Sequence, residues 1–84
     1  MKLIFSENAW EEYLDWQRTD KKILKRIPAL LKDTKRNPTD GLGKPEPLKH
    51  ALSGYWSRRI TDEHRMVYKF TDDAIHLAQF KYHY

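Results

Sequence analysis

The chain has 84 residues, and its 16 Lys and Arg against 12 Asp and Glu give a formal net charge of +4 at pH 7. This length predicts a single domain over residues 1–84. The lack of cysteine excludes disulfides and thiolate metal sites. No apolar run is long enough for a signal peptide or a membrane span, so we expect a cytoplasmic protein with no membrane partner. On charge alone, nucleic-acid binding and plain solubility are equally good interpretations.

The N-terminal residues predict an edge strand followed by a helix. Residues 2–5 end in three apolar residues, Leu3, Ile4 and Phe5, but are too few to stand alone, so we expect them to join a larger sheet as an edge strand. Ser6 is a typical N-cap for the helix that follows. The helical spacing of apolar residues predicts that Trp10 and Leu14 pack on the sheet, and that Trp16 is partly exposed.

A second helix should begin at Asp20, another good N-cap. Pro28 in mid-helix removes a hydrogen bond and clashes with the preceding turn, at a cost of ~3 kcal/mol. We therefore expect a kink near Leu24 or a helix that restarts at Pro28. The apolar positions of this helix are Ile23, Ile27, Leu30 and Leu31. Its basic residues are Lys21, Lys22, Lys25, Arg26, Lys32, Lys35 and Arg36, most of which we interpret as solvated rather than phosphate-bound.

Residues 37–53 contain all but one of the prolines and two of the glycines, which predicts a long connecting loop. Loops of this length are more often functional or disordered than idle. Glu46 lies between Pro45 and Pro47, with Lys49 three residues on. The prolines stiffen the backbone and so reduce the entropy lost on placing Glu46 in a site. The alternative interpretation is an ordinary turn whose charged side chains are solvated.

Residues 54–84 predict a meander of three antiparallel strands, because two polar turns separate segments rich in aromatic and β-branched residues. A three-residue first turn places Arg59 directly opposite Arg65. Like charges in that position destabilise by up to ~1 kcal/mol, which an anion bound between them would offset. A two-residue turn would instead place Arg59 opposite Met66.

The alternation of side chains then divides the meander into two faces. With a second three-residue turn, the arginine face also receives Gln79, Lys81 and His83. The core face receives Met66, Tyr68, Phe70, Ala78, Phe80 and Tyr82. The division is incomplete, because Val67, Ile75 and Leu77 are apolar but fall on the arginine face. The fold class expected is α+β, with a two-helix hairpin packed on a twisted antiparallel sheet and with Trp10, Leu14, Ile23, Ile27 and Leu31 against Met66, Tyr68 and Phe80.

The residues available for chemistry suit metal-independent cleavage of RNA. No cluster has metal-ligand spacing, and there is no phosphate-binding glycine loop or nucleophile motif, so we expect no metal and no cofactor. An RNA 2′-hydroxyl can itself attack the phosphodiester if a base, an acid and fixed cations are supplied. The candidates are Glu46, Lys49, Arg59, Arg65, His83 and Tyr84.

Several motifs together resemble one protein family. They are Met1-Lys2-Leu3-Ile4, Lys44-Pro45-Glu46-Pro47-Leu48-Lys49-His50, Leu52-Ser53-Gly54, Trp56-Ser57-Arg58-Arg59-Ile60-Thr61, Glu63-His64-Arg65, Val67-Tyr68 and the final Tyr82-His83-Tyr84. In this combination the chain closely resembles the YoeB toxins of the RelE/ParE superfamily, from end to end. The resemblance implies a RelE-like, microbial ribonuclease-like fold. It also implies a toxin of a bacterial type II toxin–antitoxin system that cleaves mRNA in the A site of the 70S ribosome.

The resemblance also assigns roles. It implies catalytic Glu46, Arg65, His83 and Tyr84, with Glu46 as base and His83 as acid, and substrate binding by Lys49 and Arg59. Which of Glu46 and His83 takes which proton stays open. The implied partner is a YefM-like antitoxin, and a homodimer of the free toxin is left open, as are codon preference and the antitoxin's identity.

Two other functions remain as alternatives. One is a ParE-like toxin that acts on a protein target without cutting RNA, and the other is a passive basic RNA-binding module. A passive binder has no use for Glu46 together with a terminal His83, so cleavage of translated mRNA would separate these readings.

Overall fold

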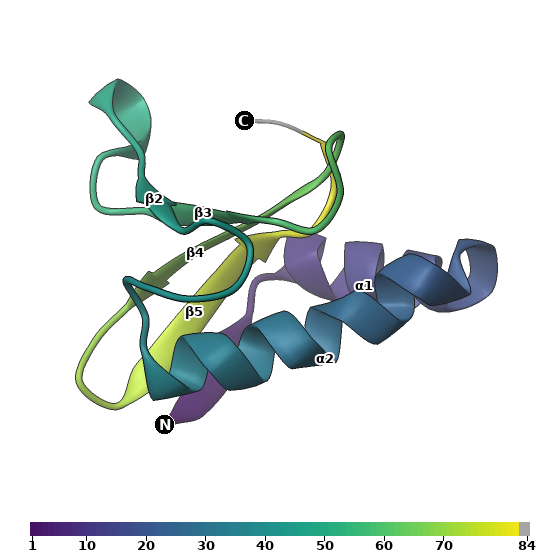
Figure 1. Ribbon diagram of the computed structural model, residues 1–84, viewed down its shortest axis with the longest axis horizontal. Helices are drawn as coiled ribbons and strands as arrows, with labels where there is room; N and C mark the ends of the chain where they lie inside the picture. Colours follow the sequence, from purple (N-terminus) through teal and green to yellow (C-terminus); the bar gives the residue numbers. More distant parts are fainter. Residues whose placement is uncertain (83–84) are drawn as a thin grey trace.

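The computed structural model describes residues 1–82 and has the expected α+β architecture, with two helices on one side of a five-stranded sheet (Figure 1). The elements in order are β1 (Lys2–Phe5), α1 (Glu7–Thr19), α2 (Lys21–Arg36), β2 (Glu46–Pro47), a 3-10 turn η1 (His50–Leu52), β3 (Trp56–Arg59), β4 (Arg65–Phe70) and β5 (Ala74–Gln79). None of the helices in this described part combines the length and apolar character needed to cross a membrane.

The strand order is β1-β5-β4-β3-β2, so the predicted meander forms the middle of the sheet. The sheet is mixed, because β1 runs parallel to β5, whereas the other neighbours are antiparallel. Figure 1 shows β2 and η1 projecting beyond the edge of the sheet that lies farthest from β1. The long loop between α2 and β3 therefore supplies an edge strand.

The first helix begins as expected but buries a different stripe. Ser6 is its N-cap and accepts a hydrogen bond from the Ala9 N–H at 3.0 Å. Trp10 is 46% exposed and Leu14 is half-buried, so the prediction for Trp10 is wrong. Trp16, predicted to be partly exposed, is buried, and its indole N–H donates to the Phe80 carbonyl at 3.0 Å. Small Ala9, fully buried, lets the helix approach the sheet, and this sets the rotation of the helix about its axis.

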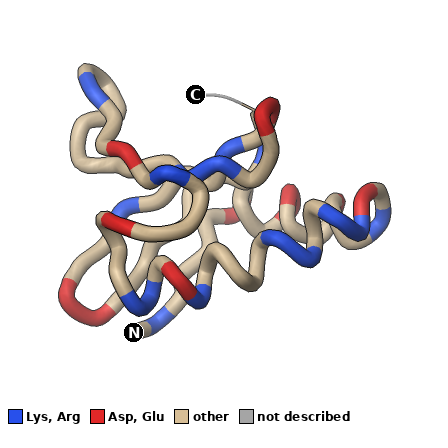
Figure 2. Tube along the Cα trace, in the orientation of Figure 1, with Lys and Arg blue, Asp and Glu red and all other residues tan. Residues whose placement is uncertain are grey.

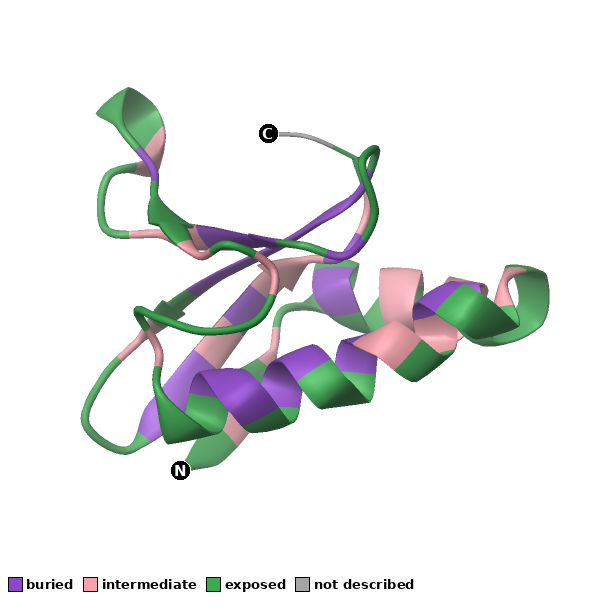
Figure 3. Cartoon of the chain, in the orientation of Figure 1, coloured by how far each residue is buried: buried purple, intermediate pink, exposed green. Residues whose placement is uncertain are grey.

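The second helix is continuous from Lys21 to Arg36, and it neither ends nor restarts at Pro28. Asp20 caps it by accepting from the N–H groups of Lys22 and Ile23 at 3.0 and 3.1 Å. The predicted apolar positions are all buried, namely Ile23, Ile27, Leu30 and Leu31. Figure 3 shows these buried positions along the side of α2 that faces the sheet, with exposed positions opposite.

The two strand turns differ in register, which moves Ile75 and Leu77 to the core face but leaves buried Val67, the partner of Ser57, on the arginine face. Between β3 and β4 the pairing is the predicted one. Between β4 and β5, Phe70 pairs with Ile75 and Tyr68 with Leu77, one position off the prediction, and an irregularity follows between Val67 and Tyr68. Ile75 and Leu77 therefore face the core, where both are buried.

Three other placements at the end of the meander also differ from the prediction. Ala78 falls at the irregularity and is only half-buried. Tyr82 is 60% exposed rather than in the core. Lys81 leaves the predicted arginine face and forms an ion pair with Asp15 of α1. The β-bulge restores the predicted faces of Gln79 and Phe80, since Gln79 pairs with Val67 and Phe80 is buried. Lys81 and Tyr82 lie beyond the end of β5, where the alternation of a strand no longer applies.

Candidate functional site

Arg59 and Arg65 lie directly opposite each other, as predicted from the turn length. The register continues this set, because Glu46 pairs with Ser57, which lies two positions before Arg59 on the same strand. Residues in register or two apart share a face of a sheet. Glu46, Arg59 and Arg65 therefore share one face. It is the face turned away from the helices, since Arg58 and Met66, the next pair, point to the core.

Arg59 and Arg65 differ in their surroundings. Arg59 is exposed, and its backbone N–H donates to the Gly43 carbonyl at 2.7 Å. Arg65 is only 8% exposed, and its Nη1 donates to the carbonyls of Thr61, Asp62 and His64 at 2.7, 3.0 and 3.2 Å. The turn between β3 and β4 thus holds the guanidinium of Arg65 in one orientation. A cation that is already oriented loses little entropy on binding a phosphate.

Glu46 and Lys49 line one hollow at the edge of the sheet. It has a volume of about 360 Å³ and is lined by Glu46, Pro47, Leu48, Lys49, His50 and Leu52. The hollow forms because β2 lasts only two residues before the chain turns into η1. The sequence predicts a loop here, but the pairing of β2 with β3 fixes the backbone of Glu46 next to the arginine strands.

Left-handed backbone occurs beside several of the candidate residues. Among residues 1–82, the non-glycine residues with positive φ are Lys44 at 52°, His50 at 59° and Tyr82 at 60°. Each is within two positions of a candidate, namely Glu46, Lys49 or His83. Such conformations cost of order 1–3 kcal/mol each and concentrate at functional sites.

The last described residues are held against α1. The Phe80 N–H donates to Glu12 Oε1 at 2.7 Å, and the Phe80 carbonyl accepts from Trp16. Lys81 pairs with Asp15 and lies over the Trp16 ring at 4.9 Å. Lys81 is the leading cause that holds the pKa of Asp15 below its ordinary value. The two remaining candidates, His83 and Tyr84, lie outside the described residues.

Arg58 stabilises the fold around the site, although its place in the sequence motif predicts no such role. Its side chain is completely buried and pairs with Asp33 of α2 at 2.8 Å. Its Nε donates to the Tyr68 hydroxyl at 3.0 Å, and that hydroxyl donates to the Pro38 carbonyl at 2.6 Å. Further guanidinium bonds reach the carbonyls of Asn37, Asp40 and Leu42. The Arg58 cluster, meaning Arg58 with Asp33 and Tyr68, therefore ties the loop before β2 to the sheet.

Charge within the Arg58 cluster is fully compensated. Arg36, the Leu42 N–H and Arg58, in that order, hold the pKa of Asp33 well below its usual range. Burial raises the pKa of the Tyr68 phenol, with Arg58 opposing the shift. Gly41 passes close by, and a Cβ there would come within 2.1 Å of Asp33 Oδ2. The cluster therefore needs glycine at that position.

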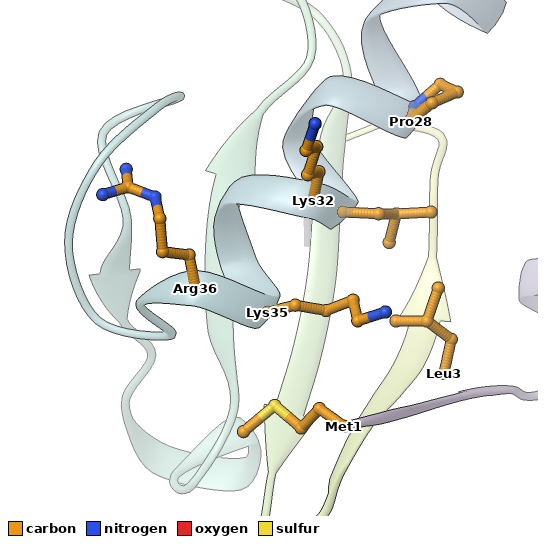
Figure 4. Close-up of a pocket in the computed structure, with 7 residues that line it drawn as sticks. Met1, Leu3, Pro28, Lys32, Lys35 and Arg36 are labelled. Atoms are coloured by element: carbon orange, nitrogen blue, oxygen red, sulfur yellow. The ribbon is translucent and has the colours of Figure 1, made fainter.

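A second hollow lies on the opposite side of the molecule, between α2 and β1. It has a volume of about 530 Å³ and is lined by Met1, Leu3, Pro28, Leu31, Lys32, Lys35 and Arg36. Figure 4 shows Pro28 and Leu3 lining the groove, with the long side chain of Lys35 reaching from α2 toward Leu3. Basic residues recur along the exposed side of α2 (Figure 2). We call this hollow the α2–β1 groove. It contains no acid–base pair.

No group of three or more His, Asp or Glu side chains within residues 1–82 is placed to hold a metal ion. The arginine face presents one carboxylate and two guanidinium groups, and Lys49 lines the adjoining hollow together with Glu46. This set of groups fits an anionic phosphodiester.

Comparison with known proteins decides the family. A family described as the YoeB-like toxin of bacterial type II toxin–antitoxin systems matches residues 5–84. The chain belongs to this YoeB toxin family. It is 63% identical to Toxin YoeB of Escherichia coli K12 over 84 residues, which is all of both chains.

Solved YoeB toxins have the same fold. A YoeB/ParE toxin from Agrobacterium tumefaciens matches with a TM-score of 0.96 and 46% identity, covering all of both chains. A YoeB dimer from Staphylococcus aureus matches with a TM-score of 0.93 and 49% identity, over 100% of this chain and 98% of that one. A YoeB–YefM complex from the same organism matches with a TM-score of 0.91 and 48% identity, with the same coverage. Toxins of this family thus occur both as a dimer and with an antitoxin.

Proposed function

We propose that this toxin is a ribosome-dependent endoribonuclease that cleaves mRNA in the A site of the 70S ribosome and so stops translation in the cytoplasm. The observation that carries the proposal is the shared face of Glu46, Arg59 and Arg65, which puts a carboxylate and two phosphate-binding forks on one surface. A protein that acted only by binding RNA would need the cations but not the acid.

The proposed reaction is a 2′-hydroxyl attack on the adjacent phosphodiester. Glu46 takes the proton of the attacking hydroxyl, and His83 gives a proton to the leaving 5′ oxygen, so the products are a 2′,3′-cyclic phosphate and a free 5′-hydroxyl. Arg65 and Arg59 stabilise the charge that builds on the phosphate oxygens, and Lys49 assists them. Tyr84 orients the substrate. No cofactor takes part in this sequence.

A translating extract tests the proposal. The wild-type toxin should produce discrete mRNA fragments, mapped by primer extension, whereas a variant lacking His83 and Tyr84 should leave the message whole. The deletion should cost little stability, because these residues follow a segment that Phe80 and Lys81 already anchor. Intact mRNA with translation arrested would favour the ParE-like alternative, and intact mRNA with translation running would favour passive binding.

The proposed protein partner is a YefM-like antitoxin, and the α2–β1 groove is its proposed docking surface. The groove offers apolar area at Leu3, Pro28 and Leu31 beside three cations, of which Arg36 is already paired with Asp33. A segment that carries both apolar side chains and carboxylates would bury the first and neutralise Lys32 and Lys35. The solved YoeB–YefM complex supports an antitoxin partner, and the solved YoeB dimer supports a dimer of the free toxin.

Charge reversal tests the groove. Replacing Lys32 and Lys35 together by Glu should weaken antitoxin binding at least tenfold, with most of the loss at low salt. The matched control reverses Lys21 and Lys22 at the other end of the same helix, which keeps the net charge equal and should leave affinity within about twofold. Equal affinity for the two double variants would place the antitoxin elsewhere.

A further inference from the structure

His64 lies where the turn between β3 and β4 meets the end of the described chain. It is 8% exposed, and its ring packs edge-on against Trp16 with centroids 4.8 Å apart. Its Nδ1 accepts a hydrogen bond from the backbone N–H of Tyr82 at 2.8 Å. An imidazole nitrogen that accepts carries no proton, so any proton on the neutral ring is on Nε2. Nε2 lies 3.7 Å from Glu63 at the surface.

The backbone of Tyr82 is held from both sides by adjacent residues. His64 binds its N–H, and the backbone N–H of Arg65 donates to its carbonyl at 3.2 Å. Gln79 reaches the same carbonyl at 3.4 Å. These bonds maintain a φ of 60°, a conformation that a tyrosine adopts only at a cost in free energy. A frayed chain end would relax out of that conformation, so the contacts determine it.

We propose that His64 is a positioning residue for the cleavage reaction, acting through Tyr82 on His83. The direction in which a chain continues is set by the backbone angles of the preceding residue. His64 holds the N–H side of Tyr82 through Nδ1, while Arg65 and Gln79 hold its carbonyl. A catalytic group displaced by about 1 Å can lose on the order of a hundredfold in rate. The inference rests on the proposed function, in which His83 is the general acid.

The alternative role for His64 is packing alone, since its ring fills space between Trp16 and Tyr82, whose ring centroid lies 5.2 Å away. Two substitutions separate the hydrogen bond from the packing. His64→Asn keeps an acceptor oxygen near the position of Nδ1 but loses most of the ring. His64→Phe keeps a ring against Trp16 but has no acceptor.

The experiment compares both variants with the wild type in two measurements. Amide hydrogen exchange of Tyr82, followed by NMR, reports the hydrogen bond, and cleavage of translated mRNA reports the acid. In His64→Phe we expect the amide of Tyr82 to exchange at least tenfold faster and mRNA to be cleaved at least tenfold more slowly. Ribosome binding should be unchanged. In His64→Asn we expect both to stay within about threefold of wild type.

The opposite results would overturn the inference. If His64→Phe shows the Tyr82 amide exchange rate and the cleavage rate of the wild type, the Nδ1 acceptor has no positioning role. If His64→Asn cleaves as slowly as His64→Phe, the packing of the ring is responsible instead of the hydrogen bond. If the wild-type protein cleaves no RNA, the proposed function fails by itself. The amide exchange rate of Tyr82 in the two variants would still show whether His64 holds the backbone of Tyr82 through its hydrogen bond.

Discussion

Arg58 and Arg59 are neighbours in β3, and the alternation of a strand gives them opposite surroundings. Arg58 is buried and bonded to α2 and the following loop, whereas Arg59 is exposed on the arginine face. Arg58→Met should lower the free energy of unfolding by about 3 kcal/mol or more, because it leaves the buried carbonyls of Asn37 and Leu42 without their donor and removes the buried cation from Asp33. Arg59→Met should change it by less than about 0.5 kcal/mol.

Urea unfolding of the two variants measures this difference in stability. Cleavage of translated mRNA measures the separate contribution of Arg59 to the reaction. Arg59→Met should cleave more slowly while remaining as stable as wild type. Equal stability of both variants would mean that the Arg58 cluster contributes little to folding.

The pairing of Arg59 with Arg65 was predictable, because turn length and period-two alternation together determine a hairpin register. The burial of Arg58 was not, since its partners come from α2 and a loop with no pattern of its own. One signal was present. Arg58 occupies the same face as Met66 and Tyr68, so the predicted register already placed a charge in the core.

Helix α1 shows how far periodicity reaches. Trp10, Tyr13 and Leu14 form one helical stripe, and Ala9, Tyr13 and Trp16 form another, rotated by a fraction of a turn. The larger side chains of the first stripe favour it as the buried one. Close packing of the helix on the sheet instead favours a small residue at the contact, and Ala9 of the second stripe is fully buried. The existence and the cap of the helix were therefore predictable, whereas its rotation depended on contacts with β5. The bulge in the β4–β5 pair is a comparable case.

Helix α2 carries Pro28 without interruption, which makes a stabilising substitution available. Proline lacks the N–H that would bond the Leu24 carbonyl, and it is less favourable than alanine in a helix interior by ~3 kcal/mol. Pro28 is exposed, so no core contact is lost on removing it. Pro28→Ala should raise the free energy of unfolding by roughly 1–3 kcal/mol.

The midpoint of urea unfolding measures the effect of Pro28→Ala, and Ala29→Gly, one position on, is a matched control that should move it downward. A lower midpoint in Pro28→Ala would show that the proline ring in the α2–β1 groove contributes packing that outweighs the missing hydrogen bond.

The Arg58 cluster links α2, the loop and the sheet, so its ionisation should appear in the acid stability of the folded chain. Because the pKa of Asp33 is depressed in the fold, its contribution is fully present above the unfolded pKa, ~3.9, and is lost as pH falls toward the lower folded value. Asp33→Asn should therefore destabilise the protein strongly at pH 7, and less as pH falls below about 4.

Urea unfolding of wild type and Asp33→Asn between pH 7 and pH 3 tests this. Asp15→Asn is the comparison, because the pKa of Asp15 is also lowered but its pair with Lys81 is more exposed. Its penalty at pH 7 should be smaller than that of Asp33→Asn. A penalty for Asp33→Asn that is the same at every pH would assign the loss to packing rather than to charge.

The parallel pairing of β1 with β5 joins the first strand of the chain to the last. During synthesis, β1 leaves the ribosome before its partner β5, while the helices, whose contacts are local, can form earlier. The contacts that hold Phe80 and Tyr82 have to wait equally long. The sheet that carries Arg59 and Arg65 is therefore completed only after β5 has been made, although the hairpin that pairs these two arginines is local and can form before it.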